Sequence, residues 1–324
     1  MIRHEPLGAT QVSQALGQLL PTGARLAAFA AVVLWGVSFV ATKAALREVS
    51  PVTLIFTRFA LGVAVLVLVL KFRRESLVPP RDSWLMLAIM GFVGIFLHQM
   101  VQAHGLTLTT AVRTGWLIGV TPIWSAVLAA IFLGEGFGPR KILGLLIGLV
   151  GALLVITRGE LSAGVLALPS TRGDLLVLAS TWTWAIYTIL GRDTLKRLGS
   201  ARATAAAMFA GWAMMIPFFV AGMGWHEYRG LSLTSLLAIL FLGPGCSGLG
   251  YWFWYAALER IDASQVAAFL YLEPLVTLLS AVALLGESGA LSTIVGGVLV
   301  LGGVLVVHAA PSRKAVGATG LDAA

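Results

Sequence analysis

The second half of the chain repeats the first. At an offset of 152 residues the matches are a proline within an apolar run, a Leu-Gly-Glu motif and two glycines: Pro122 with Pro274, 133–135 with 285–287, Gly144 with Gly296 and Gly151 with Gly303. A nearby offset of 149 residues aligns Trp35 with Trp184. Two apolar halves in such register indicate an internally duplicated membrane protein, and most proteins of that kind are transporters.

Composition places the chain in a lipid bilayer. Hydrophobic residues make up 58% of it and charged residues only 11%, with a mean hydropathy of +0.93. This leaves too little polar surface to cover a soluble globule. A helix needs about 20 apolar residues to cross the hydrocarbon. The sequence therefore predicts an all-α integral membrane protein with ten transmembrane helices, near residues 26–46, 52–71, 84–104, 109–132, 139–157, 174–191, 203–222, 234–256, 263–285 and 290–308.

Five of these predicted helices fall in each half, and the domain limits follow from them. We expect a first five-helix repeat over 26–157, a connecting loop over 158–173 and a second repeat over 174–308, with tails at 1–25 and 309–324. Because five is odd, the second copy enters the membrane from the opposite side, and the repeats are inverted. The expected substrate site lies between the copies near the midplane, and alternating access is the expected transport cycle.

Charged residues predict the orientation. Most of the 22 Lys and Arg residues face the cytoplasm if the N-terminus is cytoplasmic, so the positive-inside rule predicts that both termini and their tails are cytoplasmic. The first residues lack the compact apolar core of a signal peptide. The net charge of +8 reflects membrane anchoring, and no soluble basic stripe indicates nucleic-acid binding. Cys246 is the only cysteine and lies in an apolar run, so we expect no disulfide, metal or cofactor.

Each half also carries a set of short motifs in a characteristic order. They are Leu34-Trp35-Gly36-Val37-Ser38-Phe39, Arg58, Pro122 and 133–135 in the first half, and Gly173-Asp174, Trp184, Leu272-Glu273-Pro274 and 285–287 in the second. Together they resemble the EamA family of the drug/metabolite transporter superfamily. The resemblance implies an exporter or importer of small metabolites, such as amino acids, in the bacterial inner (plasma) membrane. Met208 stands about where Arg58 would project in the second unit, so a cationic subsite would be one-sided.

Ionisable residues within apolar runs are the first candidates for a transport cavity, because they are costly in lipid and usually face water or a partner. Arg58 either attracts an anionic group of the cargo or snorkels to the interface. Arg113, at similar depth in the outer half, either joins it or anchors a helix start. Glu273 either pairs with a cation or changes protonation during transport. His98 and Gln102 share one helical face and complete this set.

Aromatic side chains complete the predicted cavity. Most of them pack or form an interfacial belt, but Trp35 and Trp184 fall near the middle of their runs, where a belt does not explain them. We assign both to the substrate cavity, together with Ser38, Tyr187, Tyr251 and Trp254.

Prolines and glycines indicate where helices bend and touch. Pro122 and Pro274 each remove a backbone donor within a span, so we expect bends at matching depths that either act as hinges or only shape the bundle. The run 243–250 predicts that the eighth span is the least regular helix. Small-residue faces in spans five and ten predict tight contact, either between these spans or in a homodimer: Gly144, Gly148, Gly151, Gly296, Gly297 and Gly303.

Two other functions fit the sequence less well than transport. A membrane-embedded enzyme would use His98, His104 and a carboxylate, but the chain has no His-Glu-x-x-His or Gly-x-Ser-x-Gly motif. A channel would need a filter sequence, and none is apparent. The sequence also has no ATP-binding loop, so transport would draw on gradients, with protons carried by Glu273 or His98. The predicted partners are a small-molecule substrate and the lipid bilayer.

Overall fold

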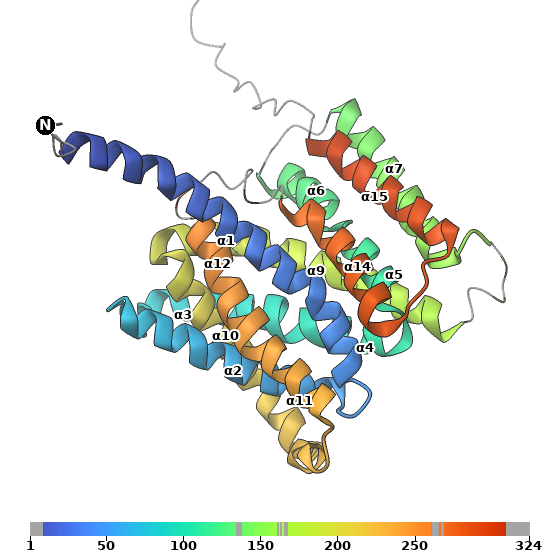
Figure 1. The fold of residues 1–324 in the computed structure, drawn as a ribbon, viewed down its shortest axis with the longest axis horizontal. Coiled ribbons are helices and arrows are strands. Elements are labelled where there is room, and N and C mark those ends of the chain that lie inside the picture. The colour runs from blue at the N-terminus through green and yellow to red at the C-terminus, as the bar shows by residue number, and fades with distance from the viewer. Residues whose placement is uncertain are drawn as a thin grey trace, which may run out of the picture.

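Helices account for the architecture that the structure describes (Figure 1). The computed structural model describes residues 9–133, 138–160, 162, 164, 168–258, 260, 266 and 269–308, and within these ranges there is no strand. Among these described residues, eight helices are long and apolar enough to cross a membrane, and two shorter apolar helices follow them, Phe269–Leu285 and Leu291–Val307. The predicted all-helical membrane class is confirmed, and ten crossings stay a prediction.

The helices of the two halves follow one another in chain order. The first half comprises α1 (Ala9–Ala45), α2 (Pro51–Phe72), the 3₁₀ turn η1 (Arg81–Ser83), α3 (Trp84–Met90), the π-helix η2 (Gly91–Leu97), α4 (His98–Leu108), α5 (Ala111–Ile118), α6 (Thr121–Leu133) and α7 (Pro139–Thr157). The second comprises α9 (Pro169–Leu198), α10 (Ser200–Ala221), the 3₁₀ helix η3 (Gly224–Tyr228), α11 (Leu233–Leu240), the π-helix η4 (Phe241–Gly250), α12 (Tyr251–Leu258), the 3₁₀ helix η5 (Phe269–Leu272), α14 (Glu273–Leu285) and α15 (Leu291–His308).

Hydroxyl side chains define where three of these helices begin. Ser50 caps α2, Thr110 caps α5 and Ser232 caps α11, and each side chain accepts a hydrogen bond from the amide three residues later. Such a cap satisfies one of the first-turn amides that have no partner inside the helix. These starts are therefore specified locally by the sequence.

The two repeated prolines lie at helix starts. Span four is interrupted, because α5 ends at Ile118 and α6 begins at Thr121, so Pro122 is the second residue of α6. Pro274 is the second residue of α14, directly after η5. A first-turn amide has no acceptor inside the helix, so proline costs nothing there. The mid-helix position expected for both prolines is wrong, and a hinge role for the interruptions stays a prediction.

Two spans contain a π-helical segment. Span eight was expected to be the least regular, and η4 contains Pro244. Span three contains the similar segment η2, which the sequence did not predict. Helix η2 begins at Gly91, and Gly91 lies close to Gly211 of α10. A Cβ added to Gly91 would be 2.7 Å from the Gly211 amide nitrogen. A close helix approach thus accompanies the irregular segment in span three.

Helices α7 and α15 pack along their lengths at one edge of the bundle, where they lie side by side in green and red (Figure 1). A Cβ added to Gly144 would lie 2.6 Å from the carbonyl oxygen of Gly303, and one added to Gly151 would lie 2.5 Å from that of Gly296. The residue number rises along α7 as it falls along α15, so the two helices are antiparallel. The glycine faces of spans five and ten therefore meet within one chain.

Two clusters of buried apolar side chains form most of the core. One surrounds Trp116 of α5 and reaches α6, α7 and α15. The other surrounds Phe59 of α2 and reaches α10 and α12. Phe39 belongs to the first cluster and Tyr251 to the second, and both line the central pocket.

Neighbouring glycines on α15 allow a direct test of the helix contact. We expect Gly303→Ala to destabilise the protein by about 1–3 kcal/mol, the usual cost of overpacking, because its Cβ would lie 2.5 Å from the Gly144 carbonyl oxygen. Gly302→Ala is the control, because nothing lies within 4 Å of that Cβ. Thermal unfolding in detergent, followed by tryptophan fluorescence, compares the two variants. Equal melting temperatures would contradict this packing.

Candidate functional site

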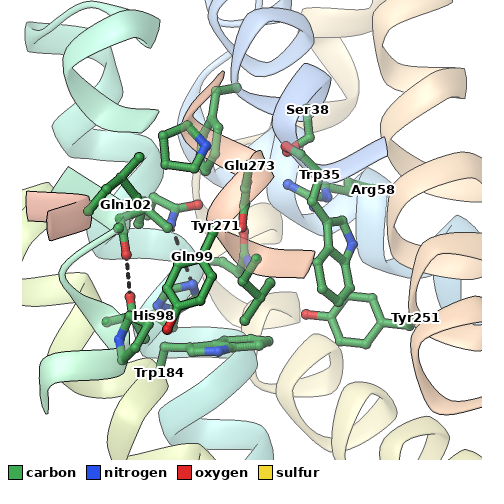
Figure 2. A pocket seen from close by; sticks show the side chains of 18 residues that line it. Trp35, Ser38, Arg58, His98, Gln99, Gln102, Trp184, Tyr251, Tyr271 and Glu273 are labelled. Carbon is green, nitrogen blue, oxygen red and sulfur yellow. Dashed lines mark hydrogen bonds between the residues drawn. The ribbon is translucent and has the colours of Figure 1, made fainter. Parts of the chain in front are cut away.

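A pocket lies at the centre of the bundle, between helices of both halves (Figure 2). Its volume is about 90 Å³. It is lined by residues from α1, α2, α4, α9, α12, η5, α14 and α15, and from the interruption between α5 and α6: Trp35, Ser38, Phe39, Arg58, His98, Gln99, Gln102, Ile118, Gly119, Thr121, Pro122, Trp184, Tyr251, Leu270, Tyr271, Glu273, Pro274 and Leu301.

Arg58 supplies the positive charge of this pocket. Its side chain is 5% exposed, and its Nε donates a hydrogen bond of 2.7 Å to the Ser247 hydroxyl of η4. Among the described residues it has no carboxylate partner. The guanidinium is therefore held by Ser247 on one edge, while its terminal nitrogens remain available to a ligand. Of the two readings of Arg58, the structure supports the cavity cation over the snorkelling side chain.

Glu273 supplies the acidic group of the pocket. It is the first residue of α14, where the helix dipole favours an anion, and it is 8% exposed. Within the described part of the chain, no cation lies within ion-pair distance of its carboxylate. The start of α14 is held against α1, because the Thr277 hydroxyl lies 2.9 Å from the Glu273 carbonyl oxygen and 3.0 Å from that of Gly36.

Aromatic rings line the pocket beside Arg58 and Glu273. The Trp35 indole donates to the Cys246 carbonyl oxygen at 3.2 Å, and its ring meets Tyr251 edge-on at 5.4 Å between centroids. Trp184 lies across the pocket, 6.5 Å from Tyr251. Of the predicted cavity aromatics, Trp254 packs behind Trp35 and Tyr187 behind Trp184, and neither lines the pocket. Their effect on a ligand would be indirect.

His98 and Gln102 lie together on α4, as their spacing predicted. The Nδ1 atom of His98 lies 2.9 Å from the Ser180 carbonyl oxygen, which can only accept, so Nδ1 carries the proton. The other ring nitrogen, Nε2, lies 3.5 Å from the Gln102 side-chain nitrogen. Ser180 thus orients the His98 ring, with Trp184 at 5.2 Å.

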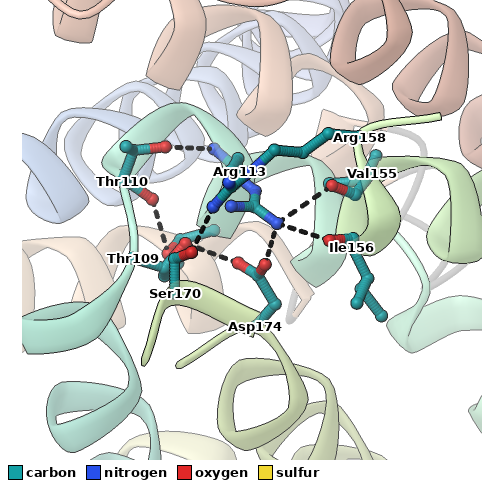
Figure 3. Close-up of polar contacts among 9 residues, drawn as sticks. Thr109, Thr110, Arg113, Val155, Ile156, Arg158, Ser170 and Asp174 are labelled. Carbon is teal, nitrogen blue, oxygen red and sulfur yellow. Dashed lines mark hydrogen bonds and ion pairs between the residues drawn. The ribbon is translucent and has the colours of Figure 1, made fainter. Parts of the chain in front are cut away.

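Arg113 lies in a second polar cluster, apart from the central pocket (Figure 3). It forms an ion pair with Asp174 of α9 and donates to the carbonyl oxygens of Val155 and Ile156 at the end of α7. Asp174 also accepts a hydrogen bond from the Thr109 hydroxyl. A buried cation that is paired in this way stabilises the local packing, so the structure does not place Arg113 in the cavity that the sequence predicted for it.

Sequence reasoning missed several residues that the structure brings to these sites. Gln99, Thr121 and Tyr271 line the central pocket, and each is within two residues of a predicted site residue or repeated proline. Asp174 is the first residue of the sixth predicted span, at the same predicted outer end of the membrane as Arg113, whose buried charge requires a counterion. A search for a compensating carboxylate at that depth could have found it.

Three carboxylates join the two halves at one end of the bundle. Glu287 accepts hydrogen bonds from the amides of Ala111 and Val112 at the start of α5. Its place at the end of a predicted span favours such a capping or loop contact, and the structure shows one. Glu48 accepts from the hydroxyl and the amide of Ser232, and these bonds lower the pKa of its carboxyl. Glu227 accepts from the amide of Ser50 at 2.6 Å. Glu135 ends the matching motif of the first half, where the sequence favours the same kind of contact, and it lies outside the described residues.

The fold and the pocket together define a class of protein: a multi-pass helical membrane protein with a small, largely apolar pocket between its two halves that holds a few charged and polar groups. No group of three His, Cys, Asp or Glu side chains suited to a metal ion occurs among the described residues. The model of the EamA-like transporter family matches residues 23–157 and 171–309. The chain belongs to the EamA-like transporter family, as the sequence motifs predicted.

Relatives of this chain occur in archaea and bacteria. A transporter of Archaeoglobus fulgidus is 30% identical over 277 residues, which cover 86% of this chain and 94% of the relative. The "probable terminal-alkyne amino-acid exporter" of Streptantibioticus cattleyicolor is 27% identical over 69% of this chain and 72% of its own length. A solved protein structure shares the fold with a TM-score of 0.64 at 22% identity, covering 88% of this chain and 98% of the other. The family and these relatives indicate a transporter rather than an enzyme.

Proposed function

We propose that this protein is a secondary transporter that moves a small zwitterionic metabolite, such as an amino acid, through the central pocket. One observation carries the proposal: the guanidinium of Arg58 and the carboxyl group of Glu273 line the same pocket, and neither has an ion-pair partner among the described residues. The carboxylate of the cargo would bind the free edge of the guanidinium. Its ammonium would bind Glu273, beside the aromatic wall of Trp35 and Tyr251. The amino-acid exporter among the relatives supports this cargo class.

The transport cycle that we propose is alternating access between two inverted repeats. The contact between α7 and α15 supports the inversion, because these helices correspond at the 152-residue offset and run antiparallel. Exchanging the repeats turns the Gly144–Gly303 contact into the Gly296–Gly151 contact. A pair of contacts that maps onto itself in this way is what a two-fold axis in the membrane plane produces.

Polar bonds close one end of the pocket, which we assign to the outer side from the distribution of basic residues. Lys43 of α1 donates to the carbonyl oxygens of Leu106 and Thr109 at the end of α4, near Glu287. The bonds of Glu48 and Glu227 described above add further links between helices. These bonds link elements of different helices, so opening of the outer side requires some of them to break. We infer that the structure corresponds to a state closed to the outside.

Lys43→Gln is expected to favour the outward-open state, because it removes the charged donor that binds the end of α4. Since Cys246 is the only cysteine, a Cys246→Ala, Ser38→Cys background places one thiol in the pocket. We expect a membrane-impermeant thiol reagent, added outside right-side-out vesicles, to label it several-fold faster in the Lys43→Gln variant. Arg47→Gln, an exposed change on the same segment, is the control. Equal labelling rates in all backgrounds would argue against this closure.

A counterflow assay tests the transport function directly. Proteoliposomes loaded with a panel of unlabelled amino acids and related zwitterions would exchange them for traces of labelled compound. We expect saturable exchange of at least one zwitterion, without ATP. Lipid scrambling or ion current in the absence of any metabolite exchange would overturn the proposal. The chain is further proposed to lie in a bacterial inner membrane with both termini cytoplasmic, which reporter fusions at each terminus can test.

A further inference from the structure

A second pocket lies at the predicted outer end of the bundle, and the proposed transport path does not use it. It is bounded by the ends of α1, α4 and α7 and by the starts of α5, α9 and α15. Its volume, about 410 Å³, is larger than that of the central pocket. Three cationic side chains line it, namely Lys43, Arg113 and Arg158, and no carboxylate side chain is among its lining residues.

The charges around this pocket are only partly balanced. Asp174, which does not line the pocket, forms an ion pair with Arg113 and also accepts a hydrogen bond from the Thr109 hydroxyl. Glu287 lies near Lys43, but both of its oxygens accept from amides of α5. Arg158 donates to the Ser170 hydroxyl and has no carboxylate partner within the described residues. One positive charge therefore remains available to a ligand.

Arg113 provides a second and independent indication of a ligand. Its side chain is 5% exposed, it lines the pocket, and its buried Nε has no hydrogen-bond partner among the described residues. A buried donor without an acceptor is costly, which is why nearly all such groups in native proteins are paired with protein, water or a ligand. An anion in the pocket would supply an acceptor once a small rotation of the Arg113 side chain exposes Nε, which has almost no accessible surface in the structure.

The backbone and the hydroxyl groups favour the same kind of ligand. Helices α9 and α15 both begin at the pocket, where Ser170 and Ala290 line it. Helix α9 has no side-chain cap; Pro169 has no N–H and the Thr171 and Arg172 amides bond to the Leu168 carbonyl oxygen, so the Ser170 amide is the first-turn donor left for an oxyanion. Donors from hydroxyl side chains surround the same space, on Thr110, Ser288 and Thr293. Arg158 itself has a left-handed backbone, with φ of 59°.

We propose that this outer pocket is a binding site for a phosphate group. A phosphate offers several strong acceptor oxygens, which suits a guanidinium, a lysine ammonium and hydroxyl donors gathered around one space. The group can come from free inorganic phosphate or from the headgroup of an anionic phospholipid such as phosphatidylglycerol, because both present the same oxygens. The inference does not depend on the cargo of the central pocket.

Arg158→Asn is the test variant, because it removes the free charge while Asn tolerates a left-handed backbone. Arg158→Lys keeps the charge and is the second variant. The control is Arg229→Gln, which removes an exposed charge outside the pocket. Monodisperse elution from a sizing column checks the folding of each protein.

Two measurements distinguish the sources of the phosphate. Thermal shifts with inorganic phosphate are compared with chloride at equal ionic strength, and native mass spectrometry counts phosphatidylglycerol retained from mixed phosphatidylglycerol and phosphatidylcholine nanodiscs. We expect at least one probe to bind the wild type and Arg229→Gln alike, and to bind Arg158→Asn about tenfold more weakly, with partial recovery in Arg158→Lys. A thermal shift alone identifies free phosphate, and lipid retention alone identifies the headgroup. Absence of both, or equal binding by Arg158→Asn, would overturn the proposal.

Discussion

Arg58→Gln is expected to abolish saturable exchange of carboxylate-bearing cargo at concentrations where the wild type works. The guanidinium is the only cation among the residues that line the central pocket, so no other side chain there can replace it. Hydrogen bonds to charged groups contribute about 1.5–3 kcal/mol, which corresponds to roughly a tenfold to hundredfold loss of affinity. Binding of the labelled cargo to purified protein, by scintillation proximity, measures the effect without requiring turnover.

Two further variants separate the charge of Arg58 from its geometry. Arg58→Lys keeps a positive charge but loses the planar pair of donors that fits a carboxylate, so we expect partial binding. Ser247→Ala removes the acceptor that orients the Nε atom and should weaken binding less than Arg58→Gln does. If Arg58→Gln weakened uncharged amide analogues of the cargo as strongly as the carboxylate itself, Arg58 would be a packing residue and the cargo assignment would be wrong.

Glu273→Gln is expected to remove the pH dependence of transport as well as most ammonium binding. A buried carboxylate inside a membrane bundle needs a cation or a proton, and no described cation lies within ion-pair distance of Glu273. The Glu273 carboxylate can then bind either the cargo ammonium or a proton, and this competition couples the movement of cargo to that of protons. The amide of Gln has nearly the same shape and cannot take up a proton. Counterflow rates measured between pH 5.5 and 8.5 should vary in the wild type and stay level in the variant.

His98→Gln distinguishes the other candidate proton carrier. His98 lines the same pocket, but its Nδ1 proton is held by the Ser180 carbonyl oxygen, so we expect this variant to keep the pH profile while changing the affinity for cargo. Glu160→Gln, an exposed carboxylate outside the pocket, is the matched control. If the pH dependence persisted in folded Glu273→Gln but was lost in His98→Gln, His98 and not Glu273 would be the proton carrier.

The interrupted spans show how far local sequence rules reach. Two prolines at one offset predicted matching irregularities in spans four and nine, and both spans are irregular there. A proline can bend a helix or begin one, and the sequence does not choose between these outcomes. Contacts with neighbouring helices decide that the prolines begin helices here: Gly119 packs against Pro274, and Gly36 of α1 lies against the start of α14. Both interruptions border the central pocket, so the choice bears directly on the site.

The sequence by itself determined the membrane class, the helical content, the duplication and the family. These follow from apolar runs, turn residues and motif spacing, which act over short stretches of chain. Only the tertiary structure decided which ionisable residues share a pocket. The sequence predicts similar depths for Arg58 and Arg113, yet the packing of their helices directs Arg58 to the central pocket and Arg113 to Asp174. The direction of a side chain around its helix depends on neighbours far along the chain, and a single sequence does not specify which neighbours those are.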